Sequence, residues 1–148
     1  MKKNVSLFVF LISFYAKSQT QDIIASVDRF FEGLHARDTL KIQSVCDKDI
    51  LLQSIIENEY GSHLENETPK KFYKTIAMAP KQLEFFEKLL DYKVMVDGYM
   101  AQVWTPYEFY INGKISHTGV NCFTLQRDNN PKQPIWKIVH IIDTRRKK

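Results

Sequence analysis

Apolar residues recur every three or four positions in the segment 21–37, QDIIASVDRFFEGLHAR. This spacing places them along one face of an α-helix, while the charged residues of the segment lie on other faces. A shorter helix is expected from Leu40 to near Asp47. Thr68-Pro69 is typical of a helix cap followed by proline at the first helical position, so a third helix is expected over 70–77.

The middle of the chain alternates between apolar runs and polar clusters. Residues 50–56, ILLQSII, are a short apolar run between polar residues and predict a buried strand, whereas the polar residues 57–67 predict a loop. Residues 84–96 fit either a helix or a strand. We interpret at least 89–96 as a strand, because the turn residues Asp97-Gly98 follow it directly.

Residues 99–144 predict three consecutive antiparallel strands. The first two are joined by Asn112-Gly113, a residue pair that type I′ hairpin turns favour because both central residues need positive φ. A polar, proline-containing loop joins the second strand to the third. Helices followed by a run of strands indicate an α+β fold, with the N-terminal helices packed on one face of a mostly antiparallel sheet.

The 148 residues are enough for one domain, and residues 1–18 have the pattern of a secretory signal peptide. Lysines near the start precede an apolar run from Val5 to Tyr15, and small residues lie one and three positions before a cleavage site in front of Gln19. The alternative, a membrane anchor, is disfavoured because the run is well short of the roughly 20 residues that span a bilayer. The sequence therefore predicts a periplasmic or secreted domain over 19–146, followed by a basic tail at 147–148.

The net charge of +4 comes from the two ends of the chain. Without the three lysines of residues 1–18 and the four basic residues of 145–148, the remaining residues carry 14 basic against 17 acidic side chains. A nucleic-acid partner is not expected, because such binding needs a basic face on the domain itself. The basic C-terminal residues are expected to be a frayed, solvated end.

The two cysteines, Cys46 and Cys122, are expected as buried free thiols, although an exported protein could join them in a disulfide. The sequence has neither a CxxC pair nor the close histidine spacings of metal sites, and it has no GxSxG nucleophile turn. It therefore gives no indication of a metal ion or of another cofactor. Asp143 and Arg145 share a strand face and are expected to form an ion pair.

The Asn112-Gly113 turn also predicts which residues of the flanking strands face each other. With a two-residue turn, Glu108 lies opposite His117 and Trp104 opposite Asn121, so these four side chains share one face. A carboxylate beside an imidazole can fix the tautomer of the histidine and raise its basicity, as general acid–base chemistry requires. A cross-strand polar pair without a chemical role would have the same sequence.

Pro106 leaves an alternative open, because proline in a central strand usually marks an edge or a bulge. A bulge at that position would move Tyr107 and Phe109 to the inner face and Glu108 to the outer face. Gly119, nominally opposite Pro106, also suggests a bend. The turn geometry favours the register without the bulge.

The last strand supplies one more candidate. Trp136, Ile138, His140 and Ile142 alternate along it and share the face that the apolar residues mark as interior, which leaves Asp143 on the other face. His140 would then point inward, either as a ligand-binding group or as a hydrogen-bonded core histidine. The candidate ligand-binding residues are therefore Trp104, Tyr107, Glu108, His117, Asn121 and His140.

In the same register the outer face of the sheet is apolar. It carries Val103, Thr105, Tyr107, Phe109 and Val120, which is more apolar area than a solvated sheet face usually shows. A homodimer through this face is expected.

The segments FFEGLHARDT, VWTPYEFY, NGK, SHTGVN and WKIVHIIDTRR, in this order, resemble the secreted bacterial branch of the nuclear-transport-factor-2-like superfamily. The resemblance covers residues 20–146, and members of this branch are sometimes labelled lumazine-binding proteins. It implies a fold similar to that of polyketide cyclases and ketosteroid isomerases, a cone in which a strongly curved sheet wraps around the helices and leaves a pocket at its open end. It also implies frequent dimerisation through the sheet, but no single activity.

Three functions remain open. The chain could bind a small, partly apolar molecule, since aromatic walls with few polar groups are typical of ligand pockets. It could be a dimerisation or interaction module with a residual pocket, which a pocket filled by its own side chains would indicate. It could also be an isomerase, dehydratase or cyclase that uses Glu108 with His117 or His140 as acid and base. Small-molecule binding is the function that the sequence favours.

Overall fold

The computed structural model describes residues 4–129 and 135–147, with side chains from residue 18 onward. In these residues the helices are α1 (Asn4–Ala36), α2 (Thr39–Val45) and α3 (Pro69–Ala77). The strands are β1 (Cys46–Asn58), β2 (Gly61–Glu67), β3 (Phe85–Leu89), β4 (Lys93–Asp97), β5 (Met100–Ile111), β6 (Lys114–Arg127) and β7 (Trp136–Lys147).

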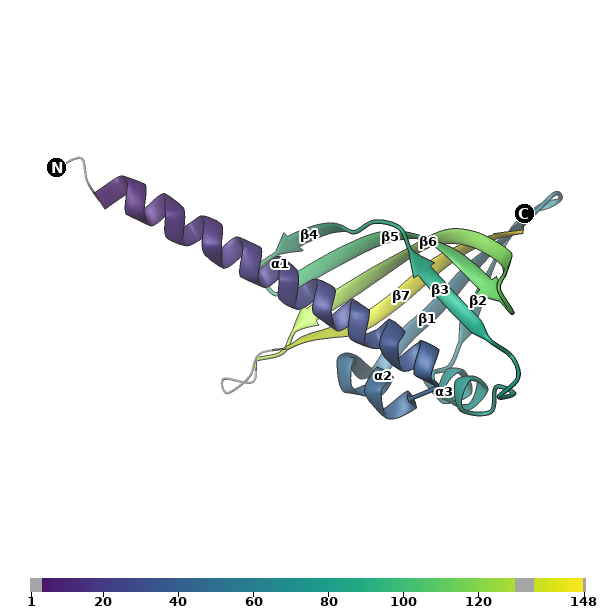
Figure 1. The fold of residues 1–148 in the computed structure, drawn as a ribbon. Helices are drawn as coiled ribbons and strands as arrows, with labels where there is room; N and C mark the ends of the chain where they lie inside the picture. Colours follow the sequence, from purple (N-terminus) through teal and green to yellow (C-terminus); the bar gives the residue numbers. More distant parts are fainter. Residues whose placement is uncertain (1–3, 130–134, 148) are drawn as a thin grey trace.

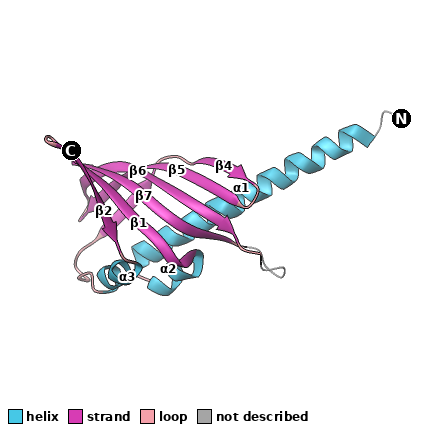
Figure 2. Cartoon of the chain, turned by 180° about the vertical axis from the view of Figure 1, so that it is seen from behind, coloured by secondary structure: helices cyan, strands magenta, loops and turns pink. Residues whose placement is uncertain are grey.

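The strands form one curved, open sheet in the order β2-β1-β7-β6-β5-β3, and β4 also pairs with β5. The pairings are antiparallel except that of β1 with β7, which is parallel. α1 crosses the concave face of this sheet, and α2 and α3 lie near the end of α1 (Figure 1). Seen from behind, none of the described helices covers the convex face (Figure 2). This arrangement is the α+β fold that the sequence predicts.

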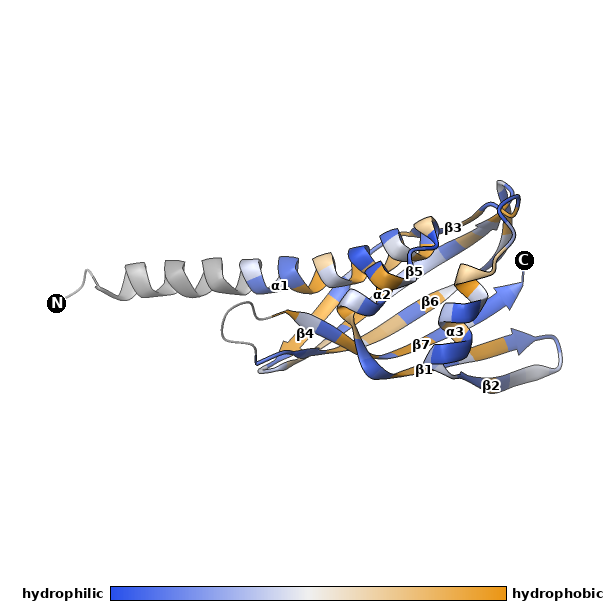
Figure 3. Ribbon diagram, turned by 90° about the horizontal axis from the view of Figure 1, so that it is seen from below, coloured by the Kyte–Doolittle hydropathy of each residue, from blue (hydrophilic) through white to orange (hydrophobic). Residues whose placement is uncertain are grey.

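The apolar face of α1 packs against the sheet. Ile23, Val27, Phe30 and Phe31 each have at most 5% of their surface exposed. Apolar residues alternate with polar ones along the strands that lie against this helix (Figure 3). The helix predicted for 21–37 is therefore confirmed, with the difference that α1 begins at Asn4 and continues without a break.

α1 ends where Arg37 takes a left-handed conformation with φ 55°. Its amide returns to the carbonyl of Leu34 at 3.2 Å, and the amide of Asp38 returns to that of Gly33 at 2.8 Å, a common way to satisfy the last carbonyls of a helix. The Asp38 side chain then accepts a hydrogen bond from the Lys41 amide at 2.9 Å and caps α2. The break predicted after residue 37 is thus confirmed.

The predicted third helix is confirmed as α3. The Thr68 hydroxyl accepts a hydrogen bond from the Lys71 amide at 3.3 Å, and Pro69 is the first helical residue. α2 ends at Val45, two residues earlier than expected, so that Cys46 begins β1 instead of lying on a helix.

The prediction of a loop over 57–67 is wrong, because these residues belong to a hairpin. β1 continues to Asn58, the chain turns at Gly61 with φ 132°, and β2 pairs with β1 as far as Glu67. β2 is an edge strand that is exposed on both faces along nearly its whole length. A strand exposed on both faces has no apolar alternation by which the sequence could reveal it.

The strand chosen for 89–96 corresponds to β4, and a further strand, β3, precedes it. Residues 90–92 separate the two, and both pair with β5. The last strand does not simply extend a meander, because β7 returns beside β1 and completes the sheet. Within residues 4–129 and 135–147, none of the helices has the length and apolar character required to traverse a bilayer.

Candidate functional site

The hairpin between β5 and β6 contains the predicted turn but not the predicted register. Asn112 and Gly113 have φ 48° and 74°, as a type I′ turn requires, and Ile111 faces Lys114. Two residues further along, Phe109 rather than Glu108 faces His117, because Ser116 is an extra residue in β6. This irregularity exchanges the two faces of β5 relative to β6.

The predicted Glu108–His117 pair is therefore wrong. Glu108 lies on the convex face, where it accepts a hydrogen bond from the Tyr110 hydroxyl at 2.8 Å. Trp104 lies on the same face and is 47% exposed. Tyr107 and Phe109 lie on the concave face, as the alternative register required, although the irregularity is at Ser116 rather than at Pro106.

The same exchange corrects the predicted outer face. Val103, Thr105 and Tyr107 are at most 2% exposed and belong to the concave side with Phe109. Val120 remains on the convex side, opposite Pro106.

A second irregularity reverses the faces of β7. His140 pairs with Thr124, but Ile138 pairs with Leu125, so Val139 is an extra residue. His140 consequently points to the convex side, where its Nε2 lies 2.9 Å from Oε1 of Gln53. The inward position predicted for His140 is wrong. Asp143, predicted to point outward, is 8% exposed on the concave side.

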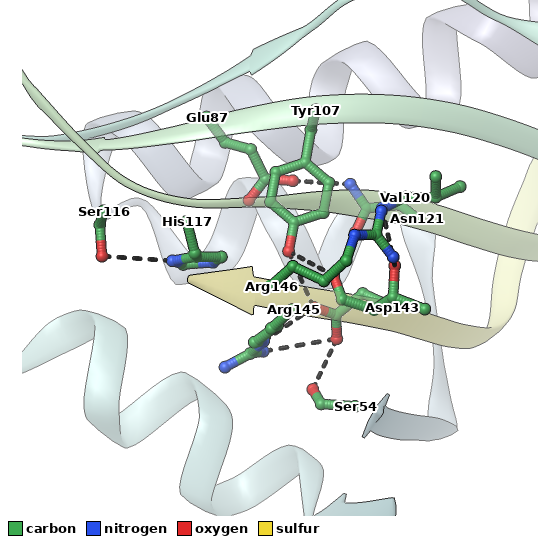
Figure 4. Close-up of polar contacts among 11 residues, drawn as sticks. Ser54, Glu87, Tyr107, Ser116, His117, Val120, Asn121, Asp143, Arg145 and Arg146 are labelled. Carbon is green, nitrogen blue, oxygen red and sulfur yellow. Dashed lines mark hydrogen bonds and ion pairs between the residues drawn. The ribbon is translucent and has the colours of Figure 1, made fainter. Parts of the chain in front are cut away.

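The concave face and the helices enclose a cavity of about 370 Å³. Its apolar wall comes from α1, α3 and the strands, and includes Phe30, Phe31, Leu34, Phe72, Ile76, Phe85, Phe109 and Phe123. Polar side chains collect on the strands at one side of it, namely Ser54, Glu87, Tyr107, His117, Asn121, Asp143 and Arg145. Figure 4 shows that Glu87, Tyr107, Asn121 and Asp143 point toward one another.

Asp143 is the centre of this polar group. The Ser54 hydroxyl donates to its Oδ1 at 2.5 Å, and Arg145 Nε donates to its Oδ2 at 2.7 Å. The Tyr107 hydroxyl lies 3.2 Å from Oδ2 and 2.9 Å from the carbonyl oxygen of Thr144, which makes the carbonyl the closer acceptor. The predicted ion pair of Asp143 with Arg145 is confirmed, and both carboxylate oxygens of Asp143 are occupied.

Glu87 lies beside this network on β3. Its Oε1 accepts a hydrogen bond from Asn121 Nδ2 at 2.6 Å. Burial raises the pKa of Glu87 to about 7, and the Asp143 carboxylate adds to this, while the bond from Asn121 and the charge of Arg145 offset part of the effect. At neutral pH the Glu87 carboxyl can therefore either hold or release a proton.

Two histidines border the site as neutral rings. Nε2 of His35 accepts a hydrogen bond from the Glu87 amide at 3.0 Å, which only an unprotonated ring nitrogen can do, and burial lowers the pKa of His35. The His117 ring stacks on Phe109 with centroids 4.8 Å apart. Burial and the Arg145 charge lower the pKa of His117, although the Asp143 charge acts in the opposite direction.

Of the predicted site residues, Tyr107, His117 and Asn121 line the cavity, whereas Trp104, Glu108 and His140 lie on the convex face. Glu87 is not among the predicted site residues, because its alternation with Phe85 becomes visible only when residues 85–89 are assigned to a strand. Asp143 and Arg145 were recognised as a pair but were assigned to the outer face. Ser54 joins the site through the parallel pairing with β7, which no local pattern predicts.

The basic C-terminal residues and one of the cysteines also differ from what the sequence predicts. Arg145 and Arg146 belong to β7 instead of a frayed tail, and Arg146 pairs with Glu57 at 3.0 Å. Both cysteines are free thiols; Cys46 is buried as predicted, but Cys122 is only half-buried on the convex face. Among the described residues, no three histidine, cysteine or acidic side chains gather in a metal-binding arrangement.

Glu87→Gln should change how stability depends on pH. The pKa of Glu87 rises on folding from 4.5 to about 7, so its protonation stabilises the folded state fully below pH 4.5, and this contribution is lost as the pH rises to 7. Glutamine can still accept the bond from Asn121 but does not titrate. Between pH 4.5 and pH 8, the free energy of unfolding of Glu87→Gln should therefore rise by about 1–3 kcal/mol relative to wild type.

Urea unfolding at the two pH values measures this difference. Glu84→Gln, which removes an exposed carboxyl on the neighbouring segment, is the control and should vary by less than about 0.5 kcal/mol. A Glu87→Gln difference that stays constant with pH would show that the Glu87 carboxyl has no raised pKa.

No family model and no curated protein sequence matches the chain. Solved structures do. A nuclear-transport-factor-2-like protein from Cytophaga hutchinsonii has a TM-score of 0.67 at 14% identity, with 86% of this chain and 98% of that chain covered. A protein with a cystatin-like fold from Nostoc punctiforme has a TM-score of 0.64 at 9% identity, covering 86% and 90%.

A third structure is that of a protein from Streptomyces avermitilis, provisionally described as a dehydratase of the nuclear-transport-factor-2-like family. It has a TM-score of 0.63 at 14% identity, with 90% of this chain and 99% of that chain covered. At these identities the likeness concerns the fold. The chain therefore has the nuclear-transport-factor-2-like cone fold that its sequence resembles.

Proposed function

We propose that the chain is an exported protein that binds a small, partly apolar molecule in the cavity between α1, α3 and the sheet. The observation that carries this proposal is the cavity itself, about 370 Å³ with phenylalanine walls and a polar group around Asp143. This size and this mixture of many apolar and few convergent polar groups are typical of ligand sites.

The open space also weighs against a module with only a residual pocket. In such a module the phenylalanines of the wall would fill the space between α1 and the sheet. Here Phe30, Phe31 and Phe123 pack edge to face with one another, and the cavity remains beside them.

A neutral apolar dye, N-phenyl-1-naphthylamine, tests the proposal. The dye should bind with increased fluorescence, and Thr75→Trp should weaken its affinity about tenfold or more, because Thr75 lines the cavity and the larger ring occupies it. Lys74→Trp is the matched control, since Lys74 is exposed on the same helix and does not line the cavity. Equal effects of the two substitutions would place the dye elsewhere.

Export is proposed from the N-terminal sequence. Residues 1–18 combine a basic start, a short apolar run and small residues before the expected cleavage site. N-terminal sequencing of protein recovered outside the cytoplasm should begin at Gln19. Recovery with Met1 or Lys2 intact would contradict cleavage.

We further propose a homodimer through the convex face of the sheet. Trp104, Cys122 and Ile142 are cross-strand neighbours on β5, β6 and β7 and form an apolar row. None of the helices in the described part of the chain lies over this face (Figure 2). Light scattering at micromolar concentration should give twice the monomer mass. Trp104→Glu should give the monomer, whereas Tyr60→Glu, at a turn away from this row, should leave the dimer intact.

Acid–base catalysis of the isomerase, dehydratase or cyclase type is the second candidate, and the Glu87 carboxyl is what favours it. A pKa of about 7 suits a group that takes and returns a proton at neutral pH, and Glu87 lines the cavity. If the protein is such an enzyme, Glu87→Gln should abolish turnover of its substrate and leave binding largely unchanged. Loss of binding and turnover together would favour a binding role for Glu87.

A further inference from the structure

We propose that the ligand of this cavity is an organic amine in its cationic form, with the ammonium group at Glu87 and the apolar body against the phenylalanine wall. This inference rests on the proposed function, that the cavity binds a small molecule. It adds the charge of the ligand and the residue that selects it.

Acidic side chains outnumber basic ones in the lining of the cavity. The lining residues include three carboxyl groups, those of Glu67, Glu87 and Asp143, against one guanidinium, that of Arg145. Arg145 is held by Asp143 through Nε at 2.7 Å, and Glu67 lies 3.9 Å from Lys71. Among the described residues, Glu87 alone of the three carboxyls forms no ion pair. A cationic ligand would supply the missing charge.

Glu87 is also positioned to receive such a group. Asn121 Nδ2 donates a hydrogen bond to Oε1 of Glu87, and no donor among the described residues bonds to Oε2 of Glu87. The neighbouring polar groups are already engaged: the His35 ring nitrogen accepts the Glu87 amide, and the Tyr107 hydroxyl donates to the Thr144 carbonyl. An ammonium group carries only donors, so it complements a carboxylate oxygen that has no donor of its own.

The apolar wall suits a cation as well as an apolar body. The faces of aromatic rings attract cations, most strongly where water is excluded. This chain already shows the effect at the cavity, because the Arg37 guanidinium lies 4.9 Å from the centroid of the Phe85 ring. Phe85 shares a strand face with Glu87 and stacks on Phe109, with centroids 6.3 Å apart.

Binding of an amine should depend on pH through Glu87. The titratable and charged groups near Glu87 are Asp143 and Arg145 from β7, Tyr107 from β5 and His35 from α1. His117 from β6 lines the same cavity. Of these, Asp143 raises and Arg145 lowers the pKa of Glu87, and burial, the largest cause, places it at about 7. An aliphatic amine stays protonated from pH 5.5 to pH 8, so over this range its affinity should rise as Glu87 ionises.

Three probes of nearly equal size separate charge from shape: 4-phenylbutylamine, 4-phenyl-1-butanol and 4-phenylbutanoate. In isothermal titration calorimetry at pH 8, the amine should bind about tenfold or more tightly than the alcohol, and the carboxylate should bind most weakly. At pH 5.5 the advantage of the amine over the alcohol should disappear. At pH 7 the amine should release protons, which buffers of different ionisation enthalpy detect as different heats.

Two variants assign the effect to Glu87. Glu87→Gln should reduce the affinity of the amine to that of the alcohol, leave the affinity of the alcohol unchanged, and abolish the proton release. Glu108→Gln makes the same change of charge on the convex face and should bind all three probes as wild type does.

The outcomes distinguish this inference from the function on which it rests. If the alcohol or the carboxylate binds as tightly as the amine, or if only the neutral dye N-phenyl-1-naphthylamine binds, the cavity does not select a cationic amine, and the inference is overturned alone. If neither the three probes nor the dye binds at the cavity, the proposed function fails with it.

Discussion

Gly119→Ala should destabilise the protein by at least about 3 kcal/mol, although it adds a single methyl group. A Cβ atom on Gly119 would overlap the carbonyl oxygen of Thr144 and lie 2.9 Å from Cε1 of Tyr107. The carbonyl belongs to the backbone of β7, so relief requires the two strands to separate. The Tyr107 hydroxyl donates to that same carbonyl at 2.9 Å, and separation would weaken this bond too.

Chemical denaturation of Gly119→Ala measures the loss. Gly113→Ala is the matched control, because Gly113 has φ 74° but nothing within 4 Å of an added Cβ. It should lose only about 1–2 kcal/mol, the usual cost of a left-handed conformation for a residue with a side chain. Equal losses of stability in the two variants would mean that the close approach of Gly119 to the Thr144 carbonyl does not add to the destabilisation.

Phe123→Ala should cost about 3–5 kcal/mol. Phe123 has no exposed surface and packs edge to face on Phe30 at 5.9 Å and on Phe31 at 5.8 Å between ring centroids. It therefore joins β6 to α1 at the point where helix and sheet meet. Its removal also enlarges the neighbouring cavity, so the lost packing is not recovered by a small local rearrangement.

Urea unfolding of Phe123→Ala can be compared with that of Tyr60→Ala. Tyr60 is 90% exposed in the turn between β1 and β2, and its truncation should change the free energy of unfolding by less than about 0.5 kcal/mol. A loss below about 1 kcal/mol for Phe123→Ala would show that α1 is not anchored to the sheet at this ring.

The helices and turns could be predicted from sequence because their signals are local. The three- and four-residue spacing of apolar residues in 21–37 and the Thr68-Pro69 cap depend only on near neighbours, as does the Asn112-Gly113 turn. These features are confirmed. β2 was missed because both faces of this edge strand are exposed, so that polar residues are tolerated throughout.

The sequence could not predict which face of the sheet each side chain occupies, because one extra residue in a strand moves every later side chain of that strand to the opposite face. Ser116 and Val139 are such residues. Neither is a glycine or a proline, so neither carries the usual signal of a bulge, and Pro106, which does, is regularly paired. For this reason only Tyr107, His117 and Asn121 of the candidate residues line the cavity, while Trp104, Glu108 and His140 lie on the opposite face.

The contacts of Glu87 could not be predicted from the sequence for a different reason. Its role depends on Asn121, 34 residues away, and on Asp143 beyond it, and these three come from separate strands. No spacing within one segment predicts such a contact. The short strand β3 is also ambiguous in sequence, so even the inward direction of Glu87 could not be inferred.

The parallel pairing of β7 with β1 determines when the cavity is completed while the chain is being synthesised. Ser54 meets its partner Asp143 across 89 residues, so Asp143 and Arg145 are synthesised well after β1. Contacts so distant in sequence form late and slowly. A ribosome-bound chain can therefore build its helices and the hairpins before β7 while the polar side of the cavity still lacks Asp143 and Arg145. The polar side of the cavity is complete only when β7 inserts between β1 and β6.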